Sequence, residues 1–367
     1  MKRYIFSASL VIATLLVWVN NIKLFGKYDS NTNQRTKALR VAGIPNNQKQ
    51  VHHIFYLKVH KTGSSTVQNV FLRYGIDRDL TFVVPNNSSG YRNVISYTDT
   101  AVPGYNIIPP PKDRHFEMLC FHVIYNRTAL DKILPNDTKY VAIVREPFLQ
   151  FDSTLRYFKH VLGDGQNVST FLKNPHLYKN QDVRGSFTNN RMAFEFDFPE
   201  SLFRDFNSHK TQEYLKKLDE EFDVVLVNEY MEESIVLLRR ILNWKVKDVI
   251  FLTLNKNNVV QTLDHTELEK RQLYRQYAKL DYALYEFFFE RLWRQISIFG
   301  QDIFREISYF KSLRRTVENF CLTDSGPYIF VQNSTWSESF RVSRKDCDDM
   351  LRHENDYVDM ILPIQYK

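Results

Sequence analysis

From Val51 onward, short apolar runs alternate with amphipathic helical patterns, and this alternation constrains the fold more than any other feature of the chain. Such alternation is typical of a parallel sheet that is covered by helices. The expected strands are Val51–Leu57, Phe116–His122, Tyr140–Val144, Phe222–Val227 and Val249–Leu254. We therefore predict an α/β fold with three layers and a central parallel sheet.

The helical patterns supply the layers that would cover this sheet. The clearest are Val67–Tyr74, Phe148–His160, Glu232–Leu242 and a long region from about Thr266, where "TELE" resembles a capping box. Apolar residues recur three or four apart through the long region, which predicts core packing rather than a ligand site. The hydrophobic content of 43% is ample for such a core.

The first 50 residues have a different character. After "MKR" comes the apolar run Tyr4–Val19, which as a helix spans about 24 Å, close to the thickness of thin bilayers. We expect a cytosolic tail at 1–3, a transmembrane signal-anchor at 4–22, a polar stem at 23–50 and a lumenal domain at 51–367. A cleaved signal peptide is the alternative, but no small-x-small cleavage site follows the run.

Sequons and cysteines bear on the compartment. N-x-[ST] sequons follow the apolar run at Asn86, Asn87, Asn126, Asn136, Asn167 and Asn333, and we predict glycans on all of these except Asn86. Chance occurrence in an Asn-rich chain is the alternative.

Three cysteines form at most one bridge, for which we expect Cys321–Cys347, with Cys120 buried and free. No zinc-binding spacing is present.

The stretch "KVHKTGSST", Lys58–Thr66, joins an expected strand to an expected helix. A helix N-terminus binds anions, Lys61 adds a positive charge, and Gly63 lets a ligand approach the backbone. The spacing differs from the ATP-binding G-x-x-x-x-G-K-[ST] loop, because Lys61 precedes Gly63. We interpret the stretch as a phosphate-binding loop; an ordinary capped turn is the alternative.

A second candidate anion site follows the strand Tyr140–Val144. Arg145 lies at the carboxyl end of that strand, where parallel sheets bind ligands, and Ser153 follows eight residues later on a helix. Arg145 is suited to bind a phosphate through two parallel hydrogen bonds, although an arginine there is as often a structural ion-pair partner.

Two histidines are candidates for a general base. His60 lies inside the phosphate-like loop, and His122 ends an apolar run. Histidine is the usual residue for taking a proton from a hydroxyl near neutral pH. A lone histidine such as His122 is more often a core residue.

The net charge of +7 suits an anionic ligand, a membrane surface or a nucleic acid. No basic block is dense enough to favour a nucleic acid, so we expect none as a partner. An alternative interpretation of the chain is a metal-dependent glycosyltransferase, which needs a D-x-D motif. "DRD" at Asp77–Asp79 and "DCD" at Asp346–Asp348 have the spacing, but neither follows a clean apolar strand.

The lysine-and-hydroxyl loop and the later Arg-to-Ser spacing resemble the sulfotransferases that use 3′-phosphoadenylyl sulfate. From about Ile54 to Phe320 the chain is similar to the galactose-3-O-sulfotransferase family. The similarity rests on "YLKVHKTGSSTVQNVFLRYG", "CFHVIYN", "YVAIVREP" and "EEFDVVLVNEYMEESIVLLRRILNW". The resemblance implies a P-loop-like sulfotransferase fold in a single-pass type II Golgi membrane protein.

The resemblance also implies roles for the candidate residues. The 5′-phosphosulfate would be held by Lys61, Thr62, Gly63, Ser64, Ser65 and Thr66, and the 3′-phosphate by Arg145 and Ser153. His60, Lys61 and His122 would be catalytic, with either histidine as the base. The acceptor would be the 3-hydroxyl of a β-galactose on a glycolipid or glycan. A sulfuryl group carries less negative charge than a phosphoryl group, so we expect no metal requirement.

Overall fold

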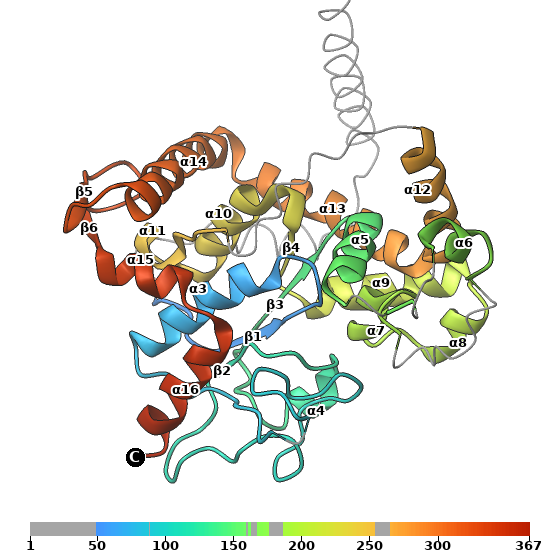
Figure 1. Cartoon of the computed structure of the whole chain (residues 1–367). Coiled ribbons are helices and arrows are strands. Elements are labelled where there is room, and N and C mark those ends of the chain that lie inside the picture. Colours follow the sequence, from blue (N-terminus) through green and yellow to red (C-terminus); the bar gives the residue numbers. More distant parts are fainter. Residues whose placement is uncertain (1–48, 88, 159–160, 163–166, 176–185, 254–264) are drawn as a thin grey trace, which may run out of the picture. The chain divides into compact units, whose positions relative to one another are not determined.

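The computed structural model describes residues 49–87, 89–158, 161–162, 167–175, 186–253 and 265–367. Four strands form the central sheet in the order β2-β1-β3-β4, and every pairing in it is parallel (Figure 1). The strands are β1 Ile54–Leu57, β2 Met118–Leu119, β3 Lys139–Val144 and β4 Val224–Val227. The predicted α/β class with a central parallel sheet is therefore confirmed.

The strands are short, and their side chains are almost wholly enclosed. Every residue of β1, β2 and β4 is buried, as expected for parallel strands covered on both faces. The longer helices that pack around them are α3 Ser64–Ile76, α5 Pro147–Tyr157, α9 Ser208–Glu221 and α10 Met231–Leu242. Shorter helical segments are α4 Arg127–Leu130, α6 Val168–Lys173, α7 Arg191–Glu195, α8 Glu200–Arg204 and η2 Asn228–Tyr230.

The predicted long helical region is divided into three helices. These are α12 His265–Tyr277, α13 Lys279–Ile298 and α14 Gly300–Thr323. The second break falls at Gly300, whose φ of 64° lies in the left-handed region that glycine adopts readily. α13 packs against β4, which confirms that the apolar stripe of this helix serves the core.

The prediction of a strand at Val249–Leu254 is wrong as far as the described residues reach. Helix α11 spans Val246–Val249, and the chain continues to Thr253 without entering the sheet. Ile250, Phe251 and Leu252 are buried, and Phe251 contacts Phe310 of α14. A short buried apolar run has no periodicity that separates a strand from a buried coil.

The C-terminal part packs against α3. Strands β5 Tyr328–Val331 and β6 Phe340–Ser343 form an antiparallel pair, followed by α15 Arg344–Leu351 and α16 Glu354–Gln365. Both of these helices contact α3 (Figure 1). The expected Cys321–Cys347 disulfide joins α14 to α15, and Cys120 is buried and free, as predicted.

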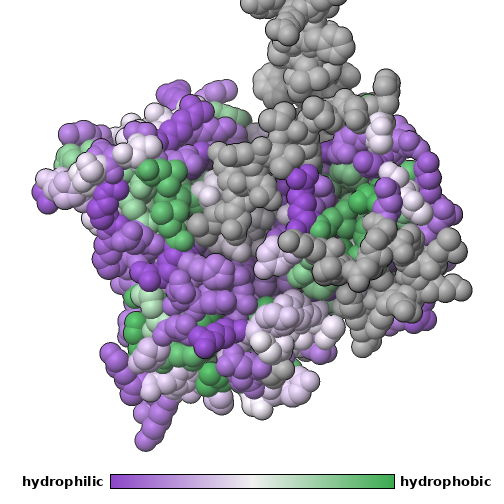
Figure 2. Space-filling view, in the orientation of Figure 1, coloured by the Kyte–Doolittle hydropathy of each residue, from purple (hydrophilic) through white to green (hydrophobic). Residues whose placement is uncertain are grey.

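The signal-anchor predicted at 4–22 and most of the stem lie outside the described residues. Among the helices that are described, none is both long enough and apolar enough to cross a bilayer. On the coloured surface in Figure 2, hydrophilic residues predominate and the apolar ones form separate patches. The apolar stripes of the helices therefore serve mainly the interior.

Candidate functional site

The carboxyl ends of β1 and β3 bring the two predicted anion-binding segments together. β1 and β3 are neighbours in the sheet, so the loop that follows β1 lies beside the residue that follows β3. Arg145 Nη1 donates a hydrogen bond of 3.0 Å to the carbonyl oxygen of Lys61. This edge of a parallel sheet is where α/β proteins bind their ligands.

The backbone of the loop is shaped for an anion at the start of α3. Lys61 and Gly63 have φ angles of 60° and 78°, and the helix begins at Ser64. The first N–H groups of a helix have no partners within it and attract negative charge. A Cβ at Gly63 would lie 2.2 Å from Asn228 Oδ1, so both the left-handed φ and the close approach favour glycine.

Two of the four loop hydroxyls are used inside the loop. Thr62 Oγ1 and Ser64 Oγ donate to the carbonyl oxygen of Val59 at 2.9 and 2.6 Å. Thr66 is buried, whereas Ser153 is half-buried on α5. In this conformation, Thr62 and Ser64 brace the turn, which leaves the lysine and the backbone N–H groups as the main donors to an anion.

Lys61 and Arg145 form a cationic pair with unusual surroundings. Burial and then the nearby Arg145 lower the pKa of Lys61 to about 8. Its Nζ lies 3.7 Å from the ring centroid of Tyr157, a cation–π contact. Arg145 Nε is buried without a hydrogen-bond partner, and burial lowers the pKa of Arg145. An anion that touched both groups would relieve their mutual repulsion.

The two candidate bases are in direct contact. The rings of His60 and His122 stack with centroids 3.6 Å apart, and the residues are only 6% and 8% exposed. Burial lowers the pKa of His60, and burial and then the neighbouring His60 hold the pKa of His122 well below its usual value. Both imidazoles are therefore neutral near pH 7 and able to accept a proton.

The hydrogen bonds assign a tautomer to each ring. His122 Nδ1 lies 2.7 Å from the carbonyl oxygen of Lys58, which only accepts, so Nδ1 carries the hydrogen and Nε2 is the acceptor. His60 Nδ1 contacts Glu195 Oε1, while Glu195 Oε2 accepts the backbone N–H of His60 at 2.8 Å. Each ring thus keeps Nε2 as its basic nitrogen.

Glu195 was not among the residues predicted from the sequence. It is buried on α7, and Arg191 Nε donates to its Oε1 at 2.6 Å. Burial raises the pKa of Glu195, but His60 and Arg191 outweigh this and lower it overall, so the carboxylate is charged. The i,i+4 spacing of Arg191 and Glu195 is the only signal in the sequence, and it does not point to His60.

Glu229 and the D-x-D motifs have structural roles. Glu229 Oε1 accepts the backbone N–H of Glu146 at 3.0 Å, and burial raises its pKa. Asp346 forms the capping box of α15 with Ser343, while Asp79 is exposed beside Arg114. These contacts give no support to nucleotide-sugar binding at either motif.

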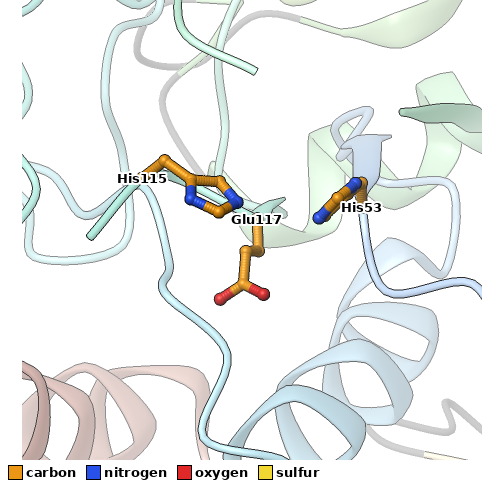
Figure 3. Close-up of side chains that lie close together, drawn as sticks. All are labelled: His53, His115 and Glu117. Carbon is orange, nitrogen blue, oxygen red and sulfur yellow. The ribbon is translucent and has the colours of Figure 1, made fainter. Parts of the chain in front are cut away.

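A possible metal-ligand cluster lies at the other end of the sheet. His53, His115 and Glu117 each offer a ligand atom within 4.8 Å of the others (Figure 3). His53 and Glu117 directly precede β1 and β2, at the amino ends of these strands, whereas the phosphate-like loop follows the carboxyl end of β1. His53 Nδ1 is also 2.6 Å from Asp137. A metal held there would not be part of the anion site.

A hollow of about 470 Å³ lies next to α7 and is lined in part by residues of the segment Asn190–Glu200. Phe194, Asp197 and Phe198 line it from this segment, with Tyr214 and Lys217 from α9. Aromatic faces combined with a few polar groups are a common lining of small-molecule sites.

The fold and this sheet edge are those expected of an enzyme that transfers an anionic group. The family model described as galactose-3-O-sulfotransferase matches residues 1–335, and the chain belongs to this family. Galactose-3-O-sulfotransferase 2 of Homo sapiens is 30% identical over 287 residues, which cover 75% of this chain and 69% of the relative. Galactosylceramide sulfotransferase of Homo sapiens is 26% identical over 295 residues, covering 78% and 67%. The predicted sulfotransferase class is confirmed.

Proposed function

We propose that this protein transfers the sulfuryl group of 3′-phosphoadenylyl sulfate to the 3-hydroxyl of a β-galactose on a glycolipid or glycan, using a P-loop-like, three-layer sulfotransferase fold. The observation that carries the proposal is the meeting of the Lys61 loop, Arg145 and the buried histidine pair at one edge of the sheet. These groups supply anion binding and proton transfer, the two requirements of the reaction.

The reaction is an in-line displacement at sulfur. The galactose 3-oxygen forms a bond to sulfur as the bond from sulfur to the 5′-phosphate oxygen breaks, and adenosine 3′,5′-bisphosphate leaves. Lys61 and the N–H groups at the start of α3 stabilise the charge that develops on the leaving phosphate. Arg145, with Ser153 on the next helix, holds the 3′-phosphate.

His60 is the base in this proposal. The carboxylate of Glu195 contacts its Nδ1 and raises its pKa against the effect of burial, so it stabilises the imidazolium that forms when Nε2 takes the hydroxyl proton. For His122, burial and the charges of His60 and Lys58 lower the pKa and outweigh the hydrogen bond to the Lys58 carbonyl, which raises it. Histidine held by a carboxylate in this way is oriented and stabilised as a base. His122 limits the positions open to the His60 ring by stacking on it.

The acceptor is placed on the α7 side of the histidines. Glu195 of α7 contacts His60, and the next part of the chain lines the hollow of about 470 Å³. Aromatic rings there suit the apolar face of a sugar. Phe203 also lines this hollow, and we expect Phe203→Ala to raise the KM for a glycan acceptor several-fold while the KM for the donor is unchanged. Equal KM values for the acceptor would remove the hollow from the acceptor site.

The proposed location is the Golgi membrane, with a single-pass type II topology. The apolar run near the N-terminus and the sequons support it. Asn87, Asn136, Asn167 and Asn333 are exposed, whereas Asn126 is half-buried and caps α4. Protease protection in intact microsomes, combined with a glycosidase-dependent mobility shift, tests both statements. Full digestion without membrane disruption would contradict the lumenal placement.

The test of activity uses the full chain with radiolabelled 3′-phosphoadenylyl sulfate. Galactosylceramide, lactosylceramide and a terminal β-galactosyl glycan serve as acceptors, with and without EDTA. Label on a galactoside that persists in EDTA supports the proposal and the absence of a metal requirement. A folded protein that binds no adenosine 3′,5′-bisphosphate would contradict it, and dependence on Mn²⁺ and a nucleotide sugar would favour a glycosyltransferase.

A further inference from the structure

Lys58, next to the candidate base in the loop, is a buried cation. Its side chain is 0% exposed, and its ammonium group pairs with the carboxylate of Glu354, whose side chain is 18% exposed. A buried charge is costly unless a partner of opposite charge is close. The buried charge of Lys58 is therefore paired with a residue from the far end of the chain.

Glu354 joins three separate segments around the loop. Its Oε2 accepts from Lys58 Nζ and, at 3.1 Å, from Ser65 Oγ, while its Oε1 accepts from Asn93 Nδ2. Lys58 precedes the phosphate-like turn and Ser65 lies in the first turn of α3. One carboxylate thus fixes both ends of the turn relative to each other.

The packing of the C-terminal helices holds Glu354 in place. It is the first residue of α16, which packs with α15 against α3. Asn69 Nδ2 of α3 donates to the carbonyl oxygen of Asp349 at 2.9 Å, and the Cys321–Cys347 disulfide holds α15 to α14. This segment lies after residue 335, where the match to the family model ends.

The charge of Glu354 also affects the pKa of the candidate catalytic residue Lys61. It raises the pKa of Lys61 against the larger effect of burial, whereas Lys58 lowers the pKa of both His60 and His122. With Glu354 in place, the positive charge beside the histidines is balanced. Without it, Lys58 would be a buried cation beside the histidines that has lost this counter-charge.

We propose that Glu354 is a positioning residue for sulfuryl transfer, which holds Lys58 and Ser65 so that the anion-binding turn and the histidine pair keep their working geometry and charge. The inference rests on the proposed function and assigns to it a residue outside the matched family region. Glu354 acts through these partners and does not itself contact the reacting atoms.

The test compares Glu354→Gln with Asp356→Asn in the full chain. Asp356 is an exposed carboxylate on the same helix, so its variant controls for charge removal from α16. We expect Glu354→Gln to lower kcat at least about tenfold, because misplaced catalytic groups lose rate steeply. We also expect the acid limb of its pH–rate profile to shift, because the charge of Lys58 beside the histidines is no longer balanced. Asp356→Asn should match the wild type in both measurements.

A charge-free pair separates positioning from stability. Lys58→Met combined with Glu354→Leu removes both charges and keeps the site filled, which restores folding in many buried ion pairs. We expect this variant to fold and bind adenosine 3′,5′-bisphosphate yet remain slow, because Ser65 and Asn93 lose their common acceptor. Wild-type kcat, KM and pH profile in folded Glu354→Gln, or full activity in the double variant, would overturn the proposal. Failure of the wild type itself to transfer sulfate would instead count against the proposed function.

Discussion

The rings of His60 and His122 lie face to face, with centroids 3.6 Å apart and planes inclined by 16°. Two buried imidazoles at this separation do not both carry a proton, because like charges in contact oppose each other. The pair therefore accepts one proton per turnover. Glu195 contacts one ring of the pair, which makes the two histidines unequal although their side chains are similarly buried.

His60→Asn should lower kcat about a hundredfold or more, since a positioned general base contributes about this much. His122→Asn should reduce kcat less, because that ring has a stacking role. Values of kcat measured for both variants at saturating donor and acceptor decide which histidine is the base. A larger loss in His122→Asn would exchange the assigned roles.

The pH dependence of kcat/KM follows from the histidines. The pKa of His60 lies below its usual value of 6.5, so the base remains neutral at that pH and activity falls only as the pH drops through the lowered pKa. Glu195→Gln removes a group that raises this pKa, so the acid limb should move to still lower pH while kcat decreases. An acid limb above 6.5 would contradict the burial of the base.

The lowered pKa of Lys61 predicts how the affinity for the donor nucleotide changes at alkaline pH. Its pKa is lowered to about 8, so the free protein loses this positive charge as the pH rises through 8, whereas a bound anion favours the charged form. The affinity for adenosine 3′,5′-bisphosphate should therefore be constant below pH 8 and weaken above it, by up to tenfold per pH unit. Calorimetry from pH 6.5 to 9.5 measures this. Lys61→Met should bind weakly, with no such change near pH 8.

Arg145→Lys tests recognition of the 3′-phosphate. Lysine keeps the charge but loses the planar fork, so affinity for adenosine 3′,5′-bisphosphate should fall about tenfold to a hundredfold. Affinity for adenosine 5′-phosphosulfate, which has no 3′-phosphate, should hardly change. Equal losses for both nucleotides would mean that Arg145 acts mainly through its bond to the Lys61 carbonyl.

The Cys321–Cys347 disulfide should stabilise the C-terminal segment. The two cysteines are 26 residues apart, and a loop of this size corresponds to about 3.5 kcal/mol. Cys321→Ser with Cys347→Ser should lower the unfolding free energy by this order and make it insensitive to reductant. Urea unfolding with and without reductant provides the measurement. Cys120→Ala, at the buried free thiol, should keep the wild-type response to reductant.

The sequence by itself determined the strand–loop–helix at Lys58–Thr66, the order of the central strands along the chain and the candidate histidines. These features depend on local periodicity and on residue types that are close in sequence. The failed strand at Val249–Leu254 shows the limit of this reasoning, since burial of an apolar run does not specify its backbone conformation.

Tertiary structure alone decided which residues complete the site. Glu195 is 135 residues from His60, and Glu354 is 296 residues from Lys58. Nothing local marks these carboxylates, because their role is to balance and orient groups that only the folded chain brings near. The free energy of a buried charge depends on its partners in space, and sheet order and helix packing choose those partners.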